Sequence, residues 1–241
     1  MTDTMTSQSP ATQPNPGLLT RLIGVIFSPR EAFAAVVARP KWLGSVVVVG
    51  LLMGVAQFAL LSTDVGKELA LDQQISTVEA FGVKISDEQY AQMERAMDNA
   101  RYTGPIFTMV AIPLFMTISA GILHVMFGLI GGGNGTYKQV YAISAHGSII
   151  SALQLMFTTI VTLAAGRSAG ANLSVFVPTL EETSFIYRFL STIDLFYVWS
   201  TFITAVGLSV LYKRRTGPIA MILFAIYFVV ALIIGYVRSG S

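Results

Sequence analysis

Ionisable side chains inside long apolar stretches include His124, His146 and Asp194. Ionisable groups within a membrane span are costly, and they usually face a bundle interior or a water-filled cavity. The two histidines lie equally far from residue 135, so two antiparallel helices joined there would hold them at one depth. A facing pair could relay protons, sense pH or share a metal ion. These three residues are therefore the candidate functional polar sites.

Each of these residues also has a structural interpretation. A neutral imidazole can bond to a hydroxyl or a carbonyl of a neighbouring helix, and two histidines alone make a poor metal site. Asp194 can equally serve the fold, bonded to Arg188 or to hydroxyls of the preceding span. Gln57 and Gln154 are expected to form hydrogen bonds between helices. Catalytic triads, paired catalytic carboxylates and phosphate-binding loops are not evident. The sequence therefore predicts no catalytic residue, no cofactor and no metal.

The composition places these residues in a membrane protein. The 241 residues are 54% hydrophobic and only 12% charged, about half the charge of a soluble chain. The apolar residues fall in blocks of about 20, the length that crosses the hydrocarbon of a bilayer. The chain has no cysteine and a net charge of +2, which excludes disulfides and thiolate sites and gives no reason to expect nucleic acid.

The order of the segments predicts an all-α, polytopic membrane protein. Residues 1–16 are predicted as a disordered tail and 17–41 as amphipathic interfacial helices, with Arg21 opposite their apolar face. A five-helix transmembrane domain follows over 42–237, and 238–241 form a carboxyl-terminal tail. A helical insertion is expected outside the membrane at 64–101. The predicted spans are 43–61, 105–130, 140–165, 186–212 and 219–237.

Local signals refine these elements. The glycine-rich run 131–135 predicts a tight hairpin between the second and third spans, because glycine tolerates positive φ. Pro113 is expected to kink the second span. Capping boxes are predicted to begin at Ser28, Ser76 and Ser86. The basic residues near the short loops favour a cytoplasmic amino terminus and an extracytoplasmic carboxyl terminus.

Several separated motifs occur in a fixed order. They are Phe27–Phe33, Pro40–Trp42, the turn Gly132–Gln139, and Ile193–Trp199 followed by Gly207. In this order they resemble the Yip family of five-span membrane proteins (Yip-one domain), named in eukaryotes for interaction with Ypt/Rab GTPases, and here its bacterial branch. The resemblance marks as family-motif positions Ser28, Pro29, Arg30, Gly133, Gly135, Lys138, Gln139, Asp194, Trp199 and Gly207.

The favoured function is a non-enzymatic integral membrane protein of Yip type, a membrane-organising or partner-binding module of the bacterial inner membrane. Its partners would be the lipid bilayer and a cytoplasmic or membrane protein, and its small-residue faces would permit a homo-oligomer. The alternative is a small transporter, channel or lipid-translocating protein with a polar path through His124, His146 and Asp194. A wet cavity joining those residues would favour transport. A packed bundle with an exposed groove would favour the binding module.

Overall fold

The computed structural model describes residues 16–79, 82–181 and 183–239. Within these ranges the chain is helical and contains no β-strand beyond an isolated bridge. Five of the helices there are long and apolar enough to cross a membrane. This confirms the predicted all-α class and the five spans. Of the predicted tails, residues 1–15 and 240–241 lie outside the described residues.

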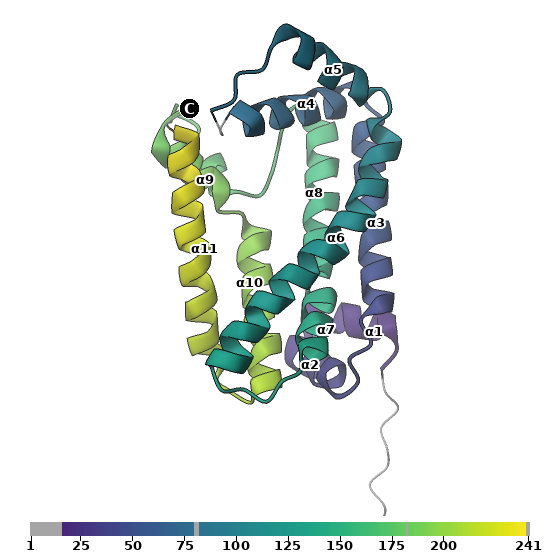
Figure 1. Cartoon of the computed structure of the whole chain (residues 1–241), viewed down its shortest axis with the longest axis vertical. Helices are drawn as coiled ribbons and strands as arrows, with labels where there is room; N and C mark the ends of the chain where they lie inside the picture. The colour runs from purple at the N-terminus through teal and green to yellow at the C-terminus, as the bar shows by residue number, and fades with distance from the viewer. Residues whose placement is uncertain (1–15, 80–81, 182, 240–241) are drawn as a thin grey trace, which may run out of the picture.

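The bundle is covered by short helices at both ends (Figure 1). At one end lie α1 (Leu18–Phe27) and α2 (Pro29–Ala38), and across the other lie α4 (Asp64–Glu79) and α5 (Asp87–Met97). The spanning elements are α3 (Leu43–Leu61), α6 (Ala100–His124) continued by the π-helix η1 (Val125–Ile130), α7 (Tyr137–Gly147) continued by α8 (Ile149–Ala165), α10 (Leu195–Tyr212) and α11 (Thr216–Ser239). Between α8 and α10 come η2 (Leu173–Phe176) and α9 (Phe185–Thr192).

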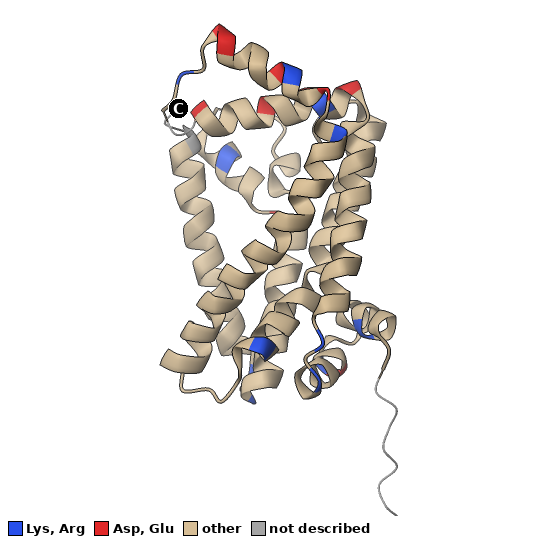
Figure 2. Ribbon diagram, turned by 45° about the vertical axis from the view of Figure 1, so that its right-hand side comes forward, with Lys and Arg blue, Asp and Glu red and all other residues tan. Residues whose placement is uncertain are grey.

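The two ends differ in charge. Figure 2 shows Lys and Arg residues at both ends of the bundle, whereas Asp and Glu residues lie mainly on α4 and α5. The segment 64–101 contains eight acidic and four basic residues. We call the end with α1, α2 and the turns 131–136 and 213–215 the basic end. The end covered by α4 and α5 is the acidic end.

The buried core lies mainly in the half of the bundle next to the basic end. Its fully buried side chains come from α1, α2, α3, α7, α8 and α10, and include Val25, Phe33, Ile143, Ile150 and Leu208. The other half is hollow. A cavity of about 1730 Å³ lies there, lined by residues of α3, α4, α8 and α9. The basic end is therefore the more tightly packed part of the molecule.

The outer surface of the spans is apolar. On α6 alone Ile106, Phe107, Val110, Leu114 and Phe115 are each more than 60% exposed. Soluble monomers rarely expose apolar patches of this extent. This surface is therefore the one that contacts lipid.

Several predicted boundaries differ from the structure. The second span begins at Ala100 and remains one helix through Pro113. The third consists of α7 and α8, which meet at Ser148. The fourth span begins at Leu195, because α9 ends at Thr192 and a separate helix starts after Asp194.

Tyr227 of α11 maintains this break between α9 and α10. Its hydroxyl donates to the Thr192 carbonyl at 2.9 Å and accepts from the Asp194 N–H at 3.2 Å. Both backbone groups are thereby satisfied without helical hydrogen bonds. The predicted span 186–212 is therefore two helices.

Of the three predicted capping boxes, the structure contains the one at Ser86 and not those at Ser28 and Ser76. Ser86 forms the complete box with Gln89, as predicted. Ser28 precedes α2 but makes no side-chain cap, and Pro29 occupies the first turn instead. Ser76 lies inside α4, because the helix that begins at Asp64 continues through it.

Helix α1 is rotated relative to the prediction. Arg21, Leu22 and Val25 face the bundle, whereas Leu19 and Phe27 point outward, Phe27 with 79% of its surface exposed. Both sides of this helix are apolar in composition, so the sequence pattern did not identify the side that packs on the bundle. The outward side chains lie where membrane lipid can cover them.

Candidate binding surface at the basic end

Most family-motif positions converge on the basic end, where they hold α2, α7 and α10 together. A Cβ on Gly207 of α10 would stand 2.4 Å from Cγ2 of Ile143 and 3.4 Å from the Phe33 ring. Only glycine lets α10 approach α7 and α2 so closely. From α7, the Gln139 side-chain amide donates to the Val37 carbonyl of α2 at 3.1 Å. The three helices form one packed unit.

The glycine turn is shaped as much by contacts with α10 as by backbone conformation. Within 131–135, only Gly132 has positive φ, +66°. A Cβ on Gly133 would stand 2.2 Å from the Tyr212 ring, and one on Gly135 would stand 2.8 Å from the Leu211 side chain. These two glycines therefore permit close packing. The predicted hairpin forms. Glycine supplies its one positive φ, at Gly132, and the close packing against α10 at Gly133 and Gly135.

A capping box starts α7 at the end of this turn. The Gln139 N–H donates to the Thr136 hydroxyl, and the Thr136 N–H donates to the Gln139 side chain at 2.9 Å. A Thr with Gln three residues later, before an apolar run, is the sequence signal for this motif. The signal is present, although the prediction did not use it. Lys138 lies beside the cap and is exposed.

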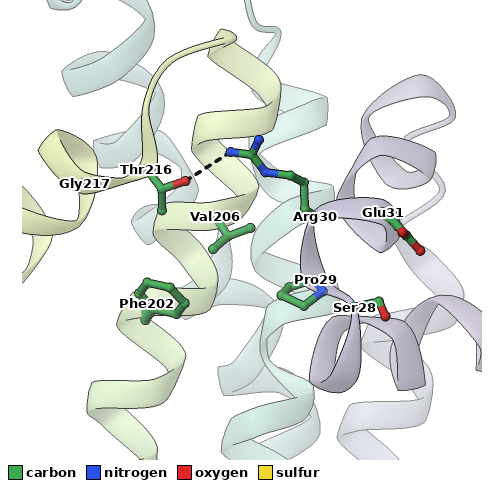
Figure 3. Close-up of a pocket in the computed structure, with 8 residues that line it drawn as sticks. All are labelled: Ser28, Pro29, Arg30, Glu31, Phe202, Val206, Thr216 and Gly217. Atoms are coloured by element: carbon green, nitrogen blue, oxygen red, sulfur yellow. Dashed lines mark hydrogen bonds between the residues drawn. The ribbon is translucent and has the colours of Figure 1, made fainter.

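A cavity of about 460 Å³ opens between α2, α10 and the start of α11 (Figure 3). We call it the Arg30 cavity. Its apolar walls include Pro29, Phe202 and Val206, and Phe202 is 46% exposed. The Arg30 guanidinium donates to the Thr216 hydroxyl at 3.4 Å, so it joins α2 to α11. Glu31 also lines the cavity.

His124 lies near the basic end, at the junction of α6 and η1. Its ring is 6.2 Å from the Tyr137 ring, measured between centroids. Its Nδ1 and the Tyr212 hydroxyl lie 3.0 and 3.2 Å from the point where a Cβ would stand on Gly128. Both atoms are buried without a hydrogen-bond partner among the described residues.

His146 occupies a different depth. It is nine residues beyond Tyr137 along α7, or about 13 Å deeper at 1.5 Å per residue. Its Nδ1 donates to the Ala142 carbonyl at 2.8 Å, and the residue is fully buried. The structure therefore does not place the two histidines at one level, because η1 and the following turn break the symmetry of the hairpin.

Asp194 is the N-cap of α10. Its carboxylate accepts from the N–H groups of Phe196 at 2.7 Å and Tyr197 at 3.3 Å, and the residue is 8% exposed. An aspartate in this position satisfies orphan N–H groups and suits the positive end of the helix dipole. It lies at the end of α10 opposite Tyr212. The 18 residues of α10 therefore separate it from the level of His124 by about 26 Å.

Trp199 and Gln57 both contribute to packing between helices. Trp199 is partly buried against the core, with its ring 6.3 Å from that of Phe196. Gln57 accepts a hydrogen bond from the Thr108 hydroxyl, which links α3 to α6 as predicted. Within the residues that the structure describes, no three His, Asp or Glu side chains gather as metal ligands.

Arg21 is a buried polar residue that the sequence reasoning missed. It is 5% exposed, and its Nε and Nη1 have no hydrogen-bond partner in the described part of the chain. The only available signal was an arginine within an otherwise apolar helix, which is equally typical of a solvated face.

Comparison with known proteins agrees with this architecture. The model of the Yip1 domain family matches residues 23–237. The chain is 26% identical to membrane protein YknW of Bacillus subtilis over 228 residues, which cover 90% of this chain and 91% of that protein. No solved structure matches it. The match extends over nearly all of the five-span bundle, and the chain belongs to the Yip1 domain family of membrane proteins.

Proposed function

We propose that the protein is a non-enzymatic, membrane-organising module whose basic end faces the cytoplasm and binds a protein partner. The observation that carries this proposal is the Arg30 cavity, an exposed groove on the most tightly packed part of the bundle. A rigid surface loses little conformational freedom when a partner binds. The packed unit of α2, α7 and α10 supplies such a surface.

The side chains around the Arg30 cavity favour a protein over an anionic lipid. Phe202 and Val206 offer apolar contact, while Arg30 and Glu31 give the lining one charge of each sign, with side chains that point in different directions (Figure 3). Protein interfaces commonly combine an apolar centre with a charged rim of both signs. The Glu31 carboxylate would repel a lipid phosphate.

The positions of the polar residues give less support to transport. Asp194 caps α10 about 26 Å from the level of His124, and Oδ1 of its carboxylate accepts hydrogen bonds from two backbone N–H groups. The large cavity of about 1730 Å³ is lined by none of His124, His146 and Asp194. A common path through these residues is therefore the weaker proposal.

The charge distribution supports the orientation. The turns 131–136 and 213–215 at the basic end are short, and Lys213, Arg214 and Arg215 directly adjoin span ends. Basic residues in short loops beside spans remain on the cytoplasmic side. We therefore propose a cytoplasmic amino terminus and an extracytoplasmic carboxyl terminus in a bacterial inner membrane.

Photo-crosslinking in native membranes tests the partner site. A photoreactive residue at Phe202 should give a discrete protein adduct, whereas one at Phe107 on the lipid-facing side of α6 should give lipid adducts. The charge reversal Arg30→Glu should abolish the protein adduct. Arg39→Glu, which reverses a charge of the same end outside the cavity lining, should retain it.

Two results would contradict the proposal. One is that Phe202 yields only lipid adducts, as Phe107 does. The other is that Arg30→Glu and Arg39→Glu weaken the protein adduct equally, which would show that general charge and not the cavity matters. An adduct of twice the chain mass would identify a second copy of the chain as the partner.

A further inference from the structure

A second cavity of the basic end, of about 380 Å³, lies beside the turn 213–215. We call it the η1 cavity. Its walls come from the π-helix and the first turns of α11, and their apolar side chains are Met126, Phe127, Pro218, Ile219 and Ile222. Such walls suit a hydrocarbon chain and offer it no hydrogen bond.

Two arginines stand at the η1 cavity. Arg214 and Arg215 both line it and are exposed, and no Asp or Glu is among its lining residues. Arg214 donates a hydrogen bond to the Gly131 carbonyl, which ties the two turns of the basic end together. Arg215 extends from the same turn. The electrostatic field at the mouth is therefore positive.

The η1 cavity lies where two spans leave the membrane. Helix η1 ends at Ile130 and α11 begins at Thr216, so the arginines stand at headgroup level. Ile222 is six residues further along α11, about 9 Å deeper at 1.5 Å per residue. From the mouth inward, the cavity therefore offers cations and then apolar walls. This is the order of charge and hydrocarbon in an anionic phospholipid.

The π-helix builds one wall of this cavity. Two backbone hydrogen bonds extend it into the turn. The Gly131 N–H donates to the Met126 carbonyl at 3.0 Å, and the Gly133 N–H donates to the Gly128 carbonyl at 2.8 Å. Both span five residues, so this turn is wider than an α-helical one. Met126 and Phe127 belong to it and line the cavity. Segments of this kind are rare and frequently accompany functional sites.

We propose that the η1 cavity binds one anionic phospholipid of the adjacent leaflet. The phosphate lies against Arg214 and Arg215, and one acyl chain descends along Met126 and Ile222. This site is separate from the Arg30 cavity, and it requires only that the basic end lies at a membrane surface. Basic pockets between spans are a recurrent way to hold lipid headgroups.

Native mass spectrometry and thermal unfolding of the purified protein in a neutral detergent test the site. Phosphatidylglycerol should add one lipid per chain and raise the unfolding temperature, while phosphatidylcholine with the same acyl chains should do neither. Arg215→Ala should raise the Kd for phosphatidylglycerol about fivefold, because one Lys or Arg near an anionic lipid surface contributes a binding free energy that corresponds to about this factor. Arg39→Ala, a cation of the same end outside the cavity, should leave it unchanged.

The apolar part of the η1 cavity is tested separately. Ile222→Trp places a large side chain there while both arginines remain, and it should abolish the single-lipid adduct. Glycerol 3-phosphate, the headgroup without chains, should bind weakly or not at all. Equal stabilisation by glycerol 3-phosphate would mean a free phosphate site and would overturn the lipid assignment. Equal binding of phosphatidylcholine, or equal effects of Arg215→Ala and Arg39→Ala, would also overturn it.

Discussion

Substitution of Gly207 by alanine is the sharpest test of how the basic end is packed. The added Cβ would stand 2.4 Å from Cγ2 of Ile143, where two carbon atoms need about 3.5 Å or more. Ile143 and Phe33 are both fully buried, so neither side chain has free space into which to move. Overpacking of a core typically costs about 1–3 kcal/mol, and this site should lie near 3 kcal/mol.

Thermal unfolding in detergent measures this cost. For a chain of this size, 1 kcal/mol corresponds to a shift of roughly 2–4 °C, so Gly207→Ala should lower the unfolding temperature by roughly 6–12 °C. Gly121→Ala is the matched control. A Cβ there meets nothing within 4 Å, and alanine favours helix over glycine by about 1 kcal/mol. Gly121→Ala should therefore be neutral or stabilising.

A second substitution tests the cause of the loss. Ile143→Ala removes the clashing Cγ2 but leaves a void, which by itself costs about 2–5 kcal/mol. In the double variant the two changes should compensate in part, so the combined loss should be clearly smaller than the sum of the single losses. Additive losses, or Gly207→Ala unfolding at the wild-type temperature, would refute the packing argument.

Three further predictions concern other parts of the fold. Asp194→Ala should lower stability by about 1 kcal/mol and Asp194→Asn by little, because asparagine also caps helices; an equal loss in both would mean that the charge itself is required. A double-mutant cycle in detergent between Gln57→Leu and Thr108→Val should give a coupling of about 0.6 kcal/mol, typical of hydrogen bonds between spans. Because the chain has no cysteine, single cysteines report topology directly: Glu94→Cys should react with an impermeant maleimide from outside intact cells, and Lys138→Cys only after lysis.

The spans could be predicted because their signal is local. Apolar blocks of sufficient length reveal membrane helices whatever surrounds them, so the number of spans and the helical class followed from the chain alone. The break before Asp194 could not be predicted in this way. The Tyr227 hydroxyl that satisfies it comes from another helix, 33 residues later, and no local pattern around Asp194 indicates that contact.

The same limit applies to the candidate sites. The equal depth of His124 and His146 assumed a symmetric hairpin, but the π-helix after His124 and the capped start of α7 shift one histidine relative to the other. The roles of Gly133 and Gly207 depend on Tyr212 and Ile143 of neighbouring helices. The resemblance to the Yip family identified these glycines as motif positions without identifying what they contact.

The buried position of Arg21 has a consequence for the order in which the protein is assembled. Helix α1 packs most extensively against α2, which follows it directly, and it also contacts α3, α7 and α8, which leave the ribosome later. The part of this packing surface that α7 and α8 supply forms only when the third span is inserted, and until then we expect the Arg21 guanidinium to stay hydrated beside the headgroups. We therefore expect the complete docking of α1 to be a late step of biogenesis. Protection of α1 from protease during synthesis should appear only after α8 has entered the membrane.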